Sequence, residues 1–146
     1  MFSTYIPKYE SQVVMDAEEV QVAKPAFQIL VVEDDPDLRR LYWENMRNWS
    51  MRPVVIVVED GREALIHLRH STPDLIVLDL AMPHVDGFKA LQQFPLRSKI
   101  VVVTGMDHHK IQRLGGIPAE IEVLQKPIPF TALYLIAQRV ACTAEM

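Results

Sequence analysis

The feature that most constrains this chain is an aliphatic run, Leu75-Ile76-Val77-Leu78, that ends at Asp79. A short run without polar alternation predicts a β-strand that is buried on both faces, as in the parallel sheets of α/β proteins. Pro83 follows soon afterwards, and proline cannot donate to a sheet ladder. We therefore expect Asp79 at the carboxyl end of a central strand, which is where open α/β sheets place their chemistry.

Four further segments have the composition of strands, and helical patterns separate them. The expected strands are Phe27–Val32, Val54–Val58, Ile100–Val103 and Ile121–Gln125. Strand and helix alternate five times along the chain, which predicts a parallel sheet with right-handed crossovers. The fold class is therefore α/β, a doubly wound sheet of five strands with helices on both faces.

Capping and turn residues give the expected helix boundaries. Asp35 and Asp60 are N-cap residues for helices after the first and second strands, and Pro36 suits a first helical position. A short helix is expected after Gly87, a weak one over Asp107–Leu114, and a last one that opens at Pro129. The last helix includes five apolar residues: Phe130, Leu133, Ile136, Ala137 and Val140.

Length and composition limit the function classes. The chain has 146 residues, which suits one domain, and its net charge of -4 without a Lys/Arg block argues against direct nucleic-acid binding. Cys142 is the single cysteine, so no intrachain disulfide can form. No window approaches the roughly 20 apolar residues of a membrane span, and the first ten residues lack a secretory core. We expect no membrane association and a cytoplasmic location.

The first segment of the chain differs from the rest. Residues 1–26 are broken up by prolines and scattered polar residues, and we expect an N-terminal extension there. Ser11–Val22 could form a helix capped by Ser11, but its valines keep poor helical spacing. A mobile leader is favoured, and a partner-binding segment is the alternative. The folded domain is expected over 27–141, with a C-terminal tail at 142–146.

Polar side chains end four of the five expected strands. The first strand stops at Glu33-Asp34, the third at Asp79, the fourth at Thr104 and the fifth at Lys126. The carboxyl ends of parallel strands lie on one edge of a sheet, so these side chains should converge. Each residue alone has an ordinary alternative, such as a helix cap or a solvated lysine. Their joint occurrence at successive strand ends favours a functional site.

The chemistry of such a cluster is specific. Carboxylates this close repel one another, and a divalent cation with oxygen ligands, Mg²⁺, relieves the repulsion. Asp79 is then the carboxylate placed to attack a phosphoryl group and form an aspartyl phosphate. Lys126 suits a flexible charge that pairs with Asp79 at rest and with phosphate oxygens afterwards, and Thr104 suits a donor to such an oxygen.

These motifs resemble those of the receiver domain of two-component response regulators. The match covers about residues 27–140, and four segments carry it in order: Ile29–Pro36 with its Glu-Asp-Asp, Leu75–Gly87 with Leu-Asp-Leu-Ala-Met-Pro, Val103–Gly105, and Leu124–Pro127. The resemblance implies the flavodoxin-like fold with strand order 2-1-3-4-5. It also implies a phosphoprotein that receives its phosphoryl group from a histidine kinase or phosphotransfer protein.

The resemblance assigns a role to each matching residue. It implies that Asp79 is the phosphoacceptor and that Glu33 and Asp34 form the acidic pair for Mg²⁺. The metal would also be bound by Asp79 and by the backbone carbonyl of Ala81. Thr104 and Lys126 would contact the phosphoryl oxygens, and a cis peptide bond is expected between Lys126 and Pro127. No role as an enzyme is expected beyond self-catalysed phosphoryl transfer and slow autodephosphorylation.

Three features depart from the family pattern. Val123 stands where an aromatic switch residue is usual, and Gly105 stands where alanine is usual. The segment from Asp79 to Thr104 is also short, which should trim the third helix. A degenerate receiver that acts as a phosphorylation-independent binding module is therefore the alternative. A phosphatase is set aside because Ala81 replaces the second carboxylate that such enzymes use.

The route from the site to a downstream effector is not specified by the sequence. Leu133, Tyr134, Leu135 and Ile136 make the last helix apolar on more than one side. That pattern indicates a homodimer through the last helix, or packing of the helix on the N-terminal extension. Ala81 and Met106 cannot position a water molecule, and we expect a long-lived phosphoryl state.

Overall fold

Five parallel strands form the central sheet of the computed structural model, which describes residues 13–15, 20–22, 26–80, 91–95 and 97–144. The strands are β3 (Gln28–Val32), β4 (Val54–Val58), β5 (Leu75–Asp79), β6 (Lys99–Thr104) and β7 (Glu122–Gln125). Their spatial order is β4-β3-β5-β6-β7, and all neighbouring pairs are parallel. The expected order 2-1-3-4-5 is confirmed, and it puts β3, β5 and β6 side by side.

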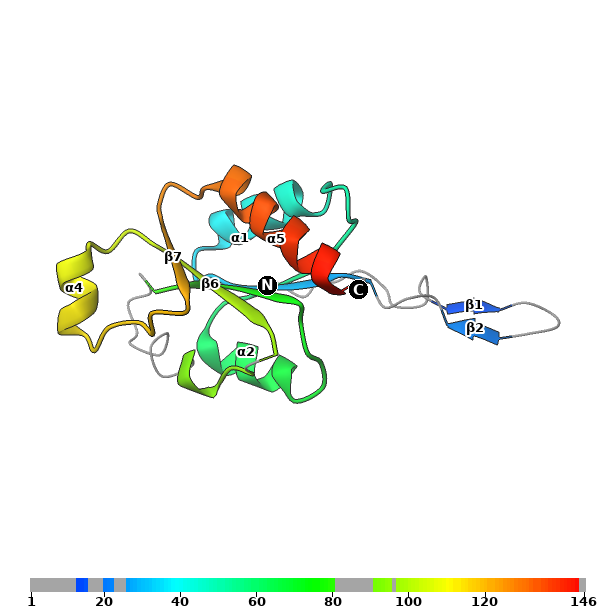
Figure 1. Ribbon diagram of the computed structural model, residues 1–146, viewed down its shortest axis with the longest axis horizontal. Coiled ribbons are helices and arrows are strands. Elements are labelled where there is room, and N and C mark those ends of the chain that lie inside the picture. Colours follow the sequence, from blue (N-terminus) through cyan, green and yellow to red (C-terminus); the bar gives the residue numbers. More distant parts are fainter. Residues whose placement is uncertain (1–12, 16–19, 23–25, 81–90, 96, 145–146) are drawn as a thin grey trace.

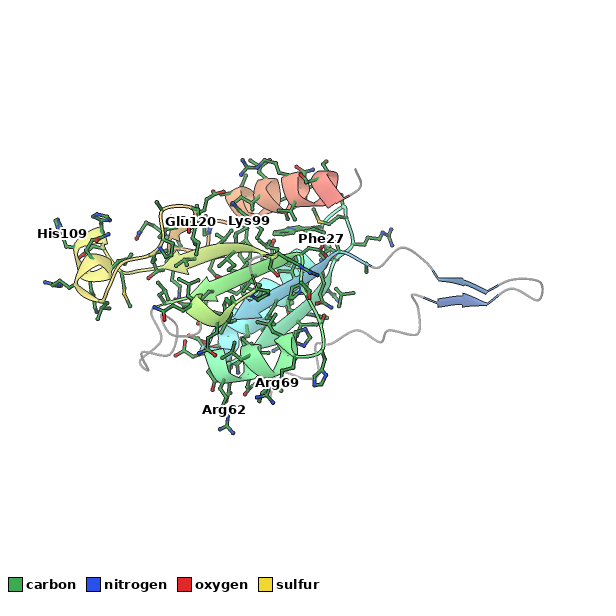
Figure 2. The ribbon with its side chains drawn as sticks, turned by 60° about the horizontal axis from the view of Figure 1, so that its bottom comes forward. Phe27, Arg62, Arg69, Lys99, His109 and Glu120 are labelled. Atoms are coloured by element: carbon green, nitrogen blue, oxygen red, sulfur yellow. The ribbon has the colours of Figure 1, made fainter. Side chains whose placement is uncertain are left out.

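Helices cover both faces of this sheet. Figure 1 shows α1 (Pro36–Met46) and α5 (Phe130–Ala144) on one face and α2 (Gly61–Leu68) on the other. The short helix α4 (His108–Arg113) lies at the far left of that view. Figure 2 shows Arg62 and Arg69 on the outer side of α2, away from the sheet. The fold is the doubly wound α/β architecture that the alternating pattern predicts.

The strand cores show why their sequences lack polar alternation. Successive strand residues point to opposite faces. Ile29 and Val31 of β3 pack with α1 and α5, whereas Leu30 and Val32 pack in the cluster beneath α2. Every residue of β5 is buried. Both faces are covered, so both sets of alternate positions have to be apolar.

The expected helix caps are confirmed. The side chain of Asp35 accepts hydrogen bonds from the first turn of α1, and Asp60 does the same for α2. Asp107 caps α4. Gly115 and Gly116, which follow α4, have positive φ angles of 112° and 76°, a region that glycine adopts at little cost.

Three segments differ from expectation or lie beyond the described residues. The helix considered over Ser11–Val22 is wrong, because Val13–Met15 (β1) and Val20–Val22 (β2) pair as antiparallel strands. Their β-branched valines favour strands. Helix α5 continues to Ala144, so residues 142–144 are helical where a tail was expected. The first residues of the short helix expected after Gly87, residues 88–90, lie outside the described part, and residues 91–93 are helical.

No helix among the described residues combines the length and apolar character that crossing a membrane requires.

The last helix is less apolar on its outer side than its sequence suggests. Leu133 and Ile136 are buried against the sheet, and Tyr134 packs edge-on against Trp49 with ring centroids 5.3 Å apart. Of the four apolar residues, Leu135 alone is more than half exposed, at 53%. The apolar character of α5 is therefore mostly used inside the domain.

The two leucines of α5 give a matched test of this packing. Leu133→Ala should lower the free energy of unfolding by about 2–5 kcal/mol, because it leaves a cavity in the core. Leu135→Ala should change it by less than about 0.5 kcal/mol, since that side chain is largely in solvent. Urea denaturation of both variants measures the difference, and equal losses would contradict the orientation of α5.

Candidate functional site

Three carboxylates meet at the carboxyl edge of the sheet. Asp79 ends β5, Glu33 follows β3, and the two side chains are only 2% and 1% exposed. Asp34, the next residue, is exposed. One oxygen from each of the three carboxylates lies within 4.8 Å of the others. The convergence expected at this edge is therefore present in the fold, because β3 and β5 are neighbouring strands.

Lys126 supplies a positive charge to this cluster. Its Nζ donates a hydrogen bond to Asp79 Oδ2 at 2.8 Å and lies 3.5 Å from Glu33 Oε1. Burial lowers the pKa of the ammonium, but the hydrogen bond to Asp79 and the charges of both carboxylates raise it more. The pKa of Lys126 is therefore above its usual value, and the residue stays a cation. The peptide bond from Lys126 to Pro127 is cis, as expected.

Thr104 is fully buried at the end of β6. Its Oγ1 accepts a hydrogen bond from the backbone N–H of Met106 at 3.0 Å. A hydroxyl that accepts in this way still has its own proton to donate. Thr104 also accepts the backbone N–H of Lys126 through its carbonyl at 2.9 Å, which ties the two strand ends together.

Arg39 is a member of this region that the sequence analysis missed. It is buried on α1, and its Nη1 donates to the carbonyl oxygens of Glu33 and Asp34 at 2.9 and 2.8 Å. The guanidinium thereby fixes the backbone that carries both acids. The signal was in the sequence, because Arg39 shares a helix face with Tyr42 and Met46 at helical spacing.

The environment of Glu33 favours its neutral form when no metal is bound. Burial raises the pKa of Glu33 to about 8, and the hydrogen bond with Asp79 and the negative charge of Asp79 act in the same direction. The backbone N–H of Asp35 and the charge of Lys126 oppose this rise. Lys126 contacts both buried carboxylates, and its single positive charge cannot neutralise both if they are ionised at neutral pH.

The donor set fits Mg²⁺. All three candidate ligands are carboxylates, which suit a hard cation, and exposed Asp34 leaves the cluster accessible to water ligands. A divalent cation would also supply the positive charge that Glu33 and Asp79 lack. Ala81, whose carbonyl was expected as a further ligand, lies outside the described residues, as do Met82, Pro83, Asp86 and Gly87.

Two family departures can be located. Val123 is on β7, the edge strand next to β6, and is 37% exposed. Gly105 has no atom within 4 Å of the position that a Cβ would take, so alanine would fit there. Neither residue touches the carboxylate cluster through any contact found among the described residues.

Comparison with known proteins decides the family. A family model of the response regulator receiver domain matches residues 29–138. The chain belongs to the response regulator receiver family. It shares the five-stranded fold and the two-component signalling class of that family.

Relatives of known name show how the domain is used elsewhere. The transcriptional regulatory protein BaeR of Escherichia coli is 33% identical over 100 residues, which is 68% of this chain and 41% of that protein. A protein-glutamate methylesterase/protein-glutamine glutaminase of Myxococcus xanthus is 35% identical over 104 residues, 68% of this chain and 30% of that enzyme. The chain therefore spans less than half the length of either relative.

Solved structures agree with this assignment. A sensor protein from Polaromonas superposes with a TM-score of 0.66 at 25% identity, covering 80% of this chain and 96% of that one. The phosphorylated cyanobacterial phytochrome response regulator RcpA gives a TM-score of 0.57 at 28% identity, covering 77% and 89%.

The raised pKa of Glu33 predicts an unusual pH dependence in the absence of metal. Between the ordinary pKa of 4.5 and about 8, the folded protein holds a proton on Glu33 that the unfolded chain releases. Stability conferred by that proton is lost as pH rises through this window. In EDTA, the free energy of unfolding should therefore fall more steeply with pH in the wild type than in Glu33→Gln.

Asp34→Asn is the control for this measurement, since Asp34 is exposed. It should keep the wild-type slope in chemical denaturation at several pH values from about 5 to 9. A Glu33→Gln variant with the full wild-type slope would show that the pH dependence comes from other groups.

Proposed function

We propose that this chain is a phosphoacceptor receiver that takes a phosphoryl group onto Asp79 from a histidine kinase or a phosphotransfer protein. The observation that carries the proposal is the buried Asp79 carboxylate, which is paired with Lys126 at 2.8 Å and lies within 4.8 Å of Glu33 and Asp34. A purely structural aspartate has no need of two further acids beside it.

The transfer itself is a simple displacement. An oxygen of Asp79 attacks the phosphorus of a phosphohistidine, the new O–P bond forms, and the P–N bond to the histidine ring breaks. Mg²⁺ held by Glu33, Asp34, Asp79 and the carbonyl of Ala81 would neutralise charge on the phosphoryl oxygens. The electron pair of the broken bond stays on the histidine nitrogen of the donor.

Lys126 and Thr104 are the residues that meet the transferred group. The ammonium that now pairs with Asp79 is placed to follow the charge to a phosphoryl oxygen. The Thr104 hydroxyl can donate to another oxygen while it still accepts from Met106. Phosphorylation would thus redirect the contact of Lys126 and add one at Thr104, which would change the surface offered to partners.

The output is a change in partner binding or in oligomeric state, with the effector protein unidentified. A homodimer through the last helix stays a prediction, with exposed Leu135 as its centre. We propose no enzyme activity beyond phosphoryl transfer to Asp79 and its slow hydrolysis. The domain limits of 27–141 and the cytoplasmic location also stay predictions.

Phosphorylation by a small-molecule donor tests the proposal. Wild-type protein with acetyl phosphate and Mg²⁺ should gain one phosphoryl group in intact-mass spectrometry, and EDTA should prevent the gain. Asp79→Asn should lose the label, because the amide is a poor nucleophile. Asp107→Asn, which keeps a capping side chain on α4, should be labelled like the wild type.

Absence of a label on wild-type protein at saturating Mg²⁺ would favour the degenerate receiver that binds partners without phosphorylation. A label that persists in Asp79→Asn would show that another residue accepts the phosphoryl group.

Met106 gives a test of the lifetime of the phosphoryl group. This side chain is partly buried against the apolar cluster beneath α2 and follows Thr104 by two residues. Met106→Gln should shorten the half-life of the phosphorylated protein several-fold, since an amide can orient a water molecule that a thioether cannot. Ile66→Gln, the same change on the exposed side of α2, should leave the half-life unchanged.

Rapid loss of the label from the purified wild type, at the rate of Met106→Gln, would refute this role for Met106.

A further inference from the structure

A buried phenol lies beside the carboxylate cluster. Tyr42 of α1 is fully buried, and its hydroxyl makes no hydrogen bond with the described residues. Buried polar groups are nearly always hydrogen-bonded. A hydroxyl left without a partner next to a functional site therefore points to a second state in which it has one.

Two observations indicate that Tyr42 lies on the same side of the sheet as Glu33. Glu33 follows Val31 by two residues, so strand alternation continues the sheet face on which Val31 and Tyr42 share one core cluster. One turn earlier on α1, Arg39 donates to the carbonyl of Glu33 at 2.9 Å. On this face of α1, Arg39 therefore binds the backbone of Glu33, and Tyr42, one turn later, is on the side of its carboxylate.

The electrostatics agree with this placement. Burial raises the pKa of Tyr42 most, and the negative charges of Glu33 and Asp79 raise it further. The phenol therefore keeps its proton and can donate it in a hydrogen bond to these acids. It is the kind of donor that a charged carboxylate would need.

Glu33 has other partners in the metal-free protein. It shares a hydrogen bond with Asp79, lies near Lys126 and accepts the backbone N–H of Asp35 at 3.2 Å. If Asp79 binds a metal ion and Lys126 binds a phosphoryl group, Glu33 loses its contacts with both residues. Carboxylates that bind metals are usually held by hydrogen bonds from surrounding residues.

We propose that Tyr42 is a positioning residue for the metal site, whose hydroxyl donates a hydrogen bond to the Glu33 carboxylate when Glu33 serves Mg²⁺. This inference rests on the proposed function, because it assumes that Glu33 takes part in binding the metal. It assigns a role in metal affinity to a core residue of α1 that never meets the phosphoryl group.

The Tyr42→Phe variant isolates the hydroxyl. The ring of Tyr42 packs edge-on against Phe130, with centroids 5.7 Å apart, and phenylalanine keeps that contact. Tyr134→Phe is the matched control, because the Tyr134 hydroxyl lies on the outer part of α5 and pairs with Ser50 at 2.7 Å and Gln138 at 2.9 Å. Both variants remove one phenolic oxygen.

Mg²⁺ titration by calorimetry, with no phosphoryl donor present, is the primary measurement. Tyr42→Phe should bind Mg²⁺ about tenfold more weakly than the wild type, the lower end of the losses seen for residues that support metal ligands. Tyr134→Phe should bind like the wild type. The stability of metal-free Tyr42→Phe should equal or exceed that of the wild type, whereas a purely structural role would lower it.

A spectroscopic readout adds an independent test. Mg²⁺ should produce a red shift in the near-ultraviolet tyrosine absorption of the wild type, because the phenol gains a charged acceptor. The shift should persist in Tyr134→Phe and vanish in Tyr42→Phe. Wild-type Mg²⁺ affinity in Tyr42→Phe, or loss of metal-free stability equal to its loss of affinity, would overturn the proposal.

The experiments distinguish failure of the proposed function from failure of the inference about Tyr42. If the wild type itself binds no Mg²⁺, the proposed function fails and takes this inference with it. If the wild type binds Mg²⁺ and is phosphorylated while Tyr42→Phe matches it in both, the inference alone fails.

Discussion

Two carboxylates buried side by side, with a single lysine between them, are the constraint on which this site depends. Glu33 and Asp79 end neighbouring parallel strands, so the pairing of β3 with β5 forces them together. Burying charge without full compensation is costly. The 2.8 Å contact from Lys126 to Asp79 relieves part of that cost, and the raised pKa of Glu33 favours a proton on its carboxyl group that relieves more of it.

This arrangement explains why the resting site would respond to cations and phosphoryl groups. A divalent cation would provide the missing positive charge and favour release of the proton from Glu33. A phosphoryl group on Asp79 would change the charge that Lys126 faces. The surrounding fold holds the reacting groups still while these changes occur: Arg39 fixes the carbonyls of Glu33 and Asp34, and Asp35 is engaged as the cap of α1.

Most of the sheet could be predicted from the sequence because β3, β4, β5 and β6 contain continuous apolar runs, whereas the edge strand β7 does not. The expected bounds of β4 and β5 match those observed, those of β3 and β7 differ by one residue at the start, and β6 is longer than expected by one residue at each end. Continuous apolar runs of this length are typical of strands that are buried on both faces of a parallel sheet. The ends of these strands then gave the cluster of Glu33, Asp34, Asp79, Thr104 and Lys126.

The features that the sequence did not predict depend on contacts between elements that are distant in the chain or too short to have a clear pattern. Arg39 is a typical surface residue by type; its spacing puts it on the buried face of α1, but the carbonyls at the end of β3 are what explain a guanidinium there. Leu135 and Leu133 look alike in the sequence, yet one is exposed and the other lies in the core. The pairing of β1 with β2 was missed because such short valine-rich segments match neither the helical nor the strand period clearly.

A crystal structure with Mg²⁺ and beryllofluoride, a mimic of the phosphoryl group, tests the central claim most directly. The account predicts beryllofluoride on Asp79 and Mg²⁺ beside Glu33 and Asp34. It also predicts that Lys126 and Thr104 contact the fluorines. A structure in which Lys126 stays 2.8 Å from Asp79, with no beryllofluoride on that residue at saturating concentrations, would contradict it.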